Sequence, residues 1–132
     1  MPGARSATLA TVLLGLLAAP LVAACGGSGA AGGPKIVLEA SDDACTVARS
    51  TLPAGPVTFS VTNTGRKVTE VYVYAQQNGS FSKTVGEAED IGPGVSRDLS
   101  VNLDKGTYEI ACKPGQQGAG LRTKLTVEAA KA

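Results

Sequence analysis

Apolar and polar residues alternate along several short stretches of the chain, and this period of two predicts β-strands. In residues 56–63, for example, Val57, Phe59 and Val61 are expected to point inward, with hydroxyl side chains between them pointing outward. No long stretch after residue 34 shows the 3.6-residue apolar period of a helix. Strands are predicted in this way over residues 35–40, 56–63, 68–75, 96–103, 107–112 and 121–127.

Turn-forming residues separate these stretches, at Pro53-Ala54-Gly55, Asn63-Thr64-Gly65, Asn78-Gly79, Gly92-Pro93-Gly94 and Lys105-Gly106. Short strands at this spacing predict an all-β sandwich or small barrel. Residues 35–132 are long enough for one compact domain with a single core. The last residues, 128–132, are expected to form a frayed tail.

The first 24 residues have the layout of a secretory signal peptide, because Arg5 precedes an apolar stretch that closes on small residues. The sequence Leu21-Val22-Ala23-Ala24-Cys25 is similar to the bacterial lipoprotein signal, in which the cysteine is lipidated and becomes the mature N-terminus. We therefore expect residues 1–24 to be removed and a lipid on Cys25 to hold the protein at the extracytoplasmic face of the cell membrane. Residues 25–34 would then tether the domain. A retained membrane helix and a soluble secreted product are the alternatives.

The composition excludes several classes of function. The chain has no His, so it cannot carry a Ser-His-Asp or Cys-His nucleophile pair, or a copper centre of the His₂Cys kind. It has 12 basic and 11 acidic residues, and loss of Arg5 with the leader would leave 11 of each. A neutral chain with two Phe and three Tyr has neither the charge nor the stacking surface of a nucleic-acid binder.

Three stretches, residues 45–59, 63–73 and 106–127, together resemble the cupredoxin fold. This resemblance implies a Greek-key β-sandwich of about seven to eight strands. In the last stretch, Cys112 stands at the position of the copper thiolate in plastocyanin-like proteins.

The other copper ligands of cupredoxins are replaced in this sequence. Glu70 stands at the first His position and Gly115 at the second, while the axial Met position falls at or beside Leu121. The resemblance therefore implies a cupredoxin scaffold without a blue-copper site.

Four ordered elements also resemble the cupredoxin-like domain of EfeO-type iron-uptake proteins: Cys45, the strand that begins with Glu70, the acidic run Glu87-Ala88-Glu89-Asp90-Ile91-Gly92-Pro93-Gly94, and the segment Tyr108 to Gly115. This likeness implies a lipoprotein that binds iron, and possibly copper, at the membrane surface. The partners it implies are an iron permease, a peroxidase or a protein with a helical imelysin-type domain. No covalent chemistry follows from it, so we do not expect an enzyme.

Cys45 and Cys112 remain for the domain once Cys25 is assigned to lipidation, and the cupredoxin topology would bring them to the same end of the sandwich. Outside the cytoplasm they are expected to form a disulfide. The alternative is a pair of thiolates that shares a metal with Glu70, a donor set that favours Cu(I) or Zn over Fe(III). A purely structural disulfide would fit a redox-inert adaptor that binds another protein.

The acidic pair Glu87 and Glu89 is the other candidate metal site. If these residues alternate on a strand, they point to the same side and offer oxygen donors to iron. The alternative is a solvated loop.

Overall fold

The computed structural model describes residue 3 and residues 32–131, and the predicted signal peptide and Cys25 lie outside the described residues. The described part is all-β. Its strands are β1 (Lys35–Ala40), β2 (Cys45–Val47), β3 (Thr51–Pro53), β4 (Gly55–Asn63), β5 (Thr69–Gln77), β6 (Ser80–Ile91), β7 (Ser96–Leu103), β8 (Gly106–Pro114) and β9 (Leu121–Glu128). The described residues form no helix that could span a lipid bilayer.

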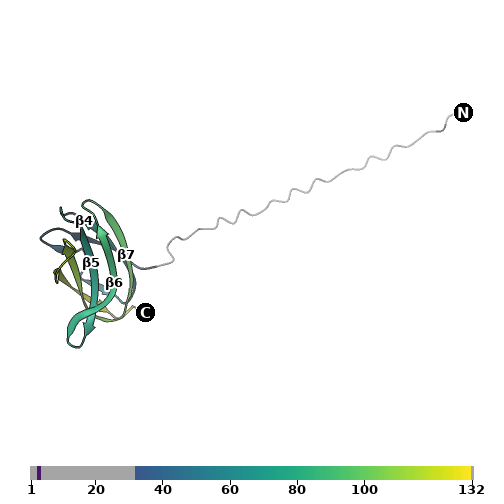
Figure 1. Ribbon diagram of the computed structural model, residues 1–132. Coiled ribbons are helices and arrows are strands. Elements are labelled where there is room, and N and C mark those ends of the chain that lie inside the picture. The colour runs from purple at the N-terminus through teal and green to yellow at the C-terminus, as the bar shows by residue number, and fades with distance from the viewer. Residues whose placement is uncertain (1–2, 4–31, 132) are drawn as a thin grey trace.

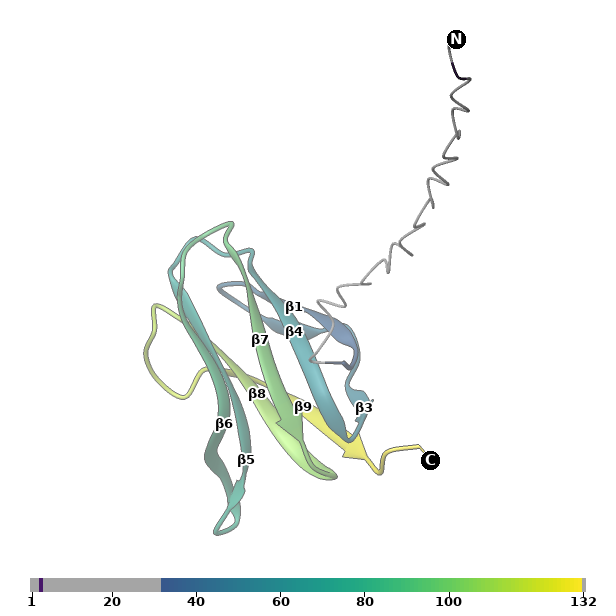
Figure 2. The same cartoon turned by 90° about the vertical axis from the view of Figure 1, so that its right-hand side faces the viewer.

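The strands form two sheets that pack face to face (Figures 1 and 2). One sheet has the order β2-β1-β4-β7, and the other has the order β3-β9-β8-β5-β6. β1 runs parallel to β4 and β3 runs parallel to β9, while the remaining neighbours are antiparallel. The structure confirms the predicted β-sandwich. Three of its nine strands were not predicted from the alternation, namely β2, β3 and β6. β2 and β3 have only three residues each, too few to show alternation.

The core confirms the inward positions that the alternation predicted. Phe59, Val61, Val71 and Ile110 are completely buried. All of the core residues come from positions 36–127, so the described domain has a hydrophobic core of its own, as an independently folding domain requires.

β6 was not predicted as a strand. Glu87 and Glu89 are exposed but lie on this strand, so the alternative of a loop is wrong. β6 is an edge strand with few buried positions, so it lacks the apolar alternation of the others. Its pairing with β5 is interrupted by three register shifts, which are β-bulges or similar irregularities. The predicted turn at Asn78 and Gly79 closes this hairpin, and both residues have positive φ, as a two-residue hairpin turn requires.

The two ends of the described domain lie on the same side of the sandwich (Figures 1 and 2). The first residue of β4, Gly55, pairs with Leu103, and Thr58 pairs with Lys35 at the start of β1. Glu128, at the end of β9, pairs with Pro53 just before β4. We call this side the terminal end. The other end carries the loops at residues 41–44, 64–68, 92–95 and 115–120, and we call it the loop end.

Candidate functional site

A disulfide joins Cys45 on β2 to Cys112 on β8, and therefore joins one sheet to the other. Its sulfur atoms are 2.03 Å apart. Cys112 is fully buried and Cys45 is 8% exposed. The structure confirms the predicted disulfide, and in this state neither sulfur is a thiolate that could bind a metal.

Glu70 lies on the opposite face of its sheet from the disulfide. Its neighbour Val71 pairs with Cys112, and both are buried in the core. Because side chains alternate along a strand, Glu70 and its own cross-strand partner Lys113 point outward. The structure therefore does not bring Glu70 together with the two sulfur atoms on one face.

Lys113 forms an ion pair with Glu70, and both side chains are mostly buried. Its Nζ lies 3.8 Å from Glu70 Oε1, and the two side chains are only 15% and 12% exposed. The same ammonium lies 4.2 Å from the centre of the Tyr72 ring, within range of a cation–π interaction. Glu70 thus already has a resident cation beside it.

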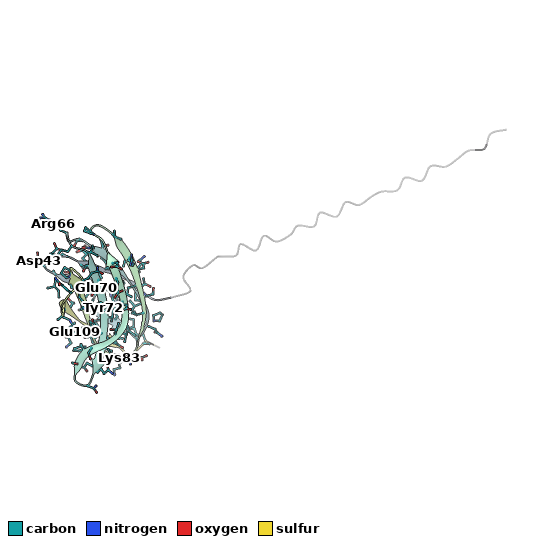
Figure 3. The ribbon with its side chains drawn as sticks, viewed as in Figure 1. Asp43, Arg66, Glu70, Tyr72, Lys83 and Glu109 are labelled. Carbon is teal, nitrogen blue, oxygen red and sulfur yellow. A yellow bond between two sulfur atoms is a disulfide. The ribbon has the colours of Figure 1, made fainter. Side chains whose placement is uncertain are left out.

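Tyr72 stacks on Tyr74, with 5.5 Å between ring centroids and 5° between the ring planes. The guanidinium of Arg122 lies 4.5 Å from the Tyr74 ring and pairs with Glu109 at 3.1 Å. Figure 3 shows Glu70, Tyr72 and Glu109 on this side of the sandwich. These side chains form a cluster on the outer face of the five-stranded sheet, and we call it the tyrosine–cation cluster (Glu70, Tyr72, Tyr74, Glu109, Lys113 and Arg122).

Glu87 and Glu89 lie on the same side of β6, beside this cluster. Tyr72 pairs with Glu87, and the Tyr72 hydroxyl donates a 2.6 Å hydrogen bond to Glu89 Oε1. Ala88, between the two glutamates, points into the core. The hydrogen bond to Glu89 is the main cause that raises the pKa of Tyr72 above its ordinary value, with desolvation and the nearby carboxylates adding to it. The Tyr72 phenol therefore stays protonated to a higher pH than an ordinary tyrosine.

Two polar side chains organise the loop end. The buried amide of Asn63 donates to the carbonyl oxygens of Lys67 and Ile91, both at 2.8 Å, and its oxygen accepts from the amide of Gly65 at 2.9 Å. The Asp42 carboxylate accepts from the backbone amides of Arg66 and Lys67.

These contacts lower the pKa of Asp42, chiefly through the bond from Arg66. A Cβ on Gly65 would lie 2.3 Å from Asp42 Oδ1, so glycine is required there. The sequence did not predict that the Asn63 side chain joins these loops by hydrogen bonds. An Asn followed by Thr-Gly is typical of a turn, and nothing in the sequence indicates that it is buried.

The donor set does not fit a blue-copper site. The sequence has no His, and the cysteine at the thiolate position is bonded to Cys45. Among the described residues, no group of three or more His, Cys, Asp or Glu side chains is arranged to hold a metal ion. The five predicted ligands are divided among the core disulfide, the outer-face residue Glu70 and the edge-strand pair Glu87 and Glu89.

Comparison with solved structures places this sandwich among the cupredoxin folds. Reduced auracyanin from Roseiflexus castenholzii superposes with a TM-score of 0.53 at 16% identity, covering 73% of this chain and 96% of that one. An azurin from Methylomonas sp. strain J superposes with a TM-score of 0.52 at 13% identity, covering 71% and 97%. At these identities the likeness defines the fold alone.

Residues 8–127 match the family described as the cupredoxin-like domain, and the chain belongs to this family. It is also 30% identical over 96 residues to the iron uptake system component EfeO of Yersinia pseudotuberculosis serotype I. The match covers 73% of this chain but only 24% of that protein, so the chain spans about a quarter of the relative's length.

Proposed function

We propose that this chain is an extracytoplasmic accessory component of an EfeO-type iron-uptake system, anchored to membrane lipid through Cys25. The observation that carries the proposal is the 30% identity to EfeO, which extends over 96 residues of a domain that lacks the ligands of a copper carrier. The signal-like sequence before Cys25 supports the location. An iron permease, a peroxidase or an imelysin-domain protein would be the partner.

In its oxidised form, the proposed component acts through protein contact. Two observations support this mode: both sulfur atoms are bonded in the core, and Glu70 already faces the ammonium of Lys113. Iron is then the cargo of the whole system, and this domain is a rigid adaptor in it.

Metal binding by the domain itself is the second candidate function, and two features favour it. Glu87, Glu89 and the Tyr72 hydroxyl lie side by side and present oxygen atoms, which suit iron. Reduction of the disulfide would give two thiolates, which suit Cu(I).

An uptake assay tests the proposed pathway. Deletion of the gene from its source organism is expected to lower the uptake of radioactive iron, and the full-length gene is expected to restore it. A Cys25→Ser version should restore it less well, because the product is no longer held at the membrane. Unchanged uptake after deletion would contradict the proposal.

Calorimetry of the soluble domain, residues 32–132, separates the two modes. The adaptor mode predicts no heat of binding with Fe(III), Fe(II) or Cu(I) while the disulfide is intact. Binding of Fe(III) by the oxidised domain that is lost in Glu89→Gln would favour the metal-binding mode. Cu(I) binding that appears only after reduction, and disappears in Cys112→Ser, would assign the metal to the cysteines.

A further inference from the structure

The terminal end of the sandwich holds a cavity of about 480 Å³ that none of the functions above uses. Its lining is mostly apolar and includes Leu52, Pro53 and Ala54 beside the last described residues of the chain. Arg49 and Lys131 also line it, and Glu128 is its one acidic residue. Among the described residues, neither Arg49 nor Lys131 forms an ion pair.

This cavity lies at the end of the domain where the N-terminal tether enters. Pro34 accepts a 3.0 Å hydrogen bond from the amide of Thr58, near the start of β4. Ala54, in the cavity lining and just before β4, donates to Glu128 at 2.7 Å. The cavity and the point of attachment are therefore both beside the first residues of β4.

The point of attachment favours the terminal end for contact with the bilayer if Cys25 is lipidated. Residues 26–34 separate Cys25 from β1, and even a fully extended chain of that length reaches no further than about 30 Å. The loop end lies about 20 Å further from the tether, because the six residues of β1, at about 3.3 Å each, run from the tether to that end. The terminal end is therefore the end of the domain that is attached closer to the lipid anchor.

We propose that this end is a membrane-docking surface, and that Arg49 and Lys131 in the cavity lining bind the phosphate groups of anionic phospholipids. The orientation rests on the lipid anchor of the proposed function. Anionic headgroups attract Lys and Arg side chains within about one Debye length of the surface, and the two cations exceed the single carboxylate of Glu128. Docking would fix the orientation of the domain, with the loop end turned away from the membrane.

The test uses the soluble domain, residues 32–132, so that the lipid anchor contributes nothing. Co-sedimentation is measured with vesicles of phosphatidylcholine alone and with vesicles containing phosphatidylglycerol. The domain is expected to bind only the second kind, and added salt should release it. Arg49→Ala/Lys131→Ala should weaken binding by about fivefold for each cation removed. Glu128→Gln should strengthen it.

The matched control is Arg66→Ala/Lys67→Ala, which removes two exposed cations from the loop end. This variant should bind the vesicles as tightly as the unmodified domain. Equal loss in both double variants would mean unspecific attraction and would overturn the proposal, as would equal binding to both kinds of vesicle. Amide shifts at residues 49–54 with inorganic phosphate, but not with vesicles, would also overturn it.

Failure of this experiment leaves the iron-uptake proposal standing, since the uptake assay does not depend on headgroup binding. Conversely, vesicle binding by the domain together with iron uptake that is unchanged after deletion of the gene would support the docking surface and contradict the iron-uptake proposal.

Discussion

The ammonium of Lys113 lies over the ring of Tyr72, with Nζ 4.2 Å from the ring centroid. It also pairs with Glu70 in a place where neither charged group has much contact with water. A metal ion bound by Glu70 would have to compete with this built-in cation. The relationship makes Glu70 a structural residue in the oxidised protein, and it can be tested by stability measurements.

Lys113→Met is expected to destabilise the domain by about 1–3 kcal/mol, because it leaves the carboxylate of Glu70 without its partner. Urea unfolding measures this free energy. Lys83→Met, on the exposed part of β6, is the matched control and should change stability little. In the background of Lys113→Met, Glu70→Gln should recover part of the loss. Equal stability of the two lysine variants would show that the pair contributes nothing.

The disulfide is expected to contribute on the order of 4 kcal/mol to the stability of the domain, because it closes a loop with a sequence separation of 67. The variant Cys45→Ala/Cys112→Ala should unfold at correspondingly lower urea concentration. Reductant should destabilise the unmodified domain and leave this variant unaffected. A variant as stable as the parent would mean that the packing of the two sheets alone determines stability.

Asn63→Ala should be among the most destabilising single substitutions at the loop end, at about 2–4 kcal/mol, since it leaves two carbonyl groups and one amide without partners. Thermal unfolding provides the measurement. Asn102→Ala, at an exposed position on β7, is the control and should have little effect. A similar melting temperature for both variants would contradict this role of Asn63.

The stability of the loop end should depend on pH through Asp42. Its pKa is lowered in the folded protein, so the stabilising contacts are fully present above the ordinary value of 3.8 and are lost as the pH falls through the folded value. Asp42→Asn should flatten the acid limb of the stability profile. Asp43→Asn should retain the acid limb of the parent. A parent-like acid limb in Asp42→Asn would show that other carboxylates control it.

Tyr72 should titrate only at strongly alkaline pH, because its bond to Glu89 raises its pKa. The raised pKa means that its contribution to stability is present below pH 10, the ordinary value, and is lost as the pH rises further. Absorbance of the tyrosinate near 295 nm follows the titration. In Glu89→Gln the Tyr72 transition should move towards its ordinary range. A titration curve unchanged by Glu89→Gln would contradict the assignment.

The alternation of residues predicted six of the strands, which each have one buried face, and it correctly placed Phe59 and Val61 among the inward positions. What the pattern could not supply was the register between β5 and β8, which pairs Val71 with Cys112 and Glu70 with Lys113. That register depends on the packing of the two sheets.

The candidate site was predicted only in part, because its contacts also depend on how the strands pair and how the two sheets pack. Cys45 and Cys112 were correctly paired because the resemblance supplied a topology that brings them together. The edge strand β6 was not predicted, because it is largely exposed and its register shifts interrupt the alternation of apolar and polar residues. The contacts of Lys113 and Arg122 with the tyrosine rings were not predicted, because a Lys or Arg on a strand is usually an exposed surface charge. Only the folded arrangement of the strands brings the rings next to these cations.

The disulfide also determines how the domain would respond to mechanical load. A protein tethered at one terminus and pulled at the other transmits force along its backbone, but the bond between Cys45 and Cys112 carries that force directly from β2 to β8. Residues 45–112 form a covalently closed ring that tension cannot extend while the bond is intact. Stretching would then lengthen only the segments outside the ring, and β4 to β7 would be spared.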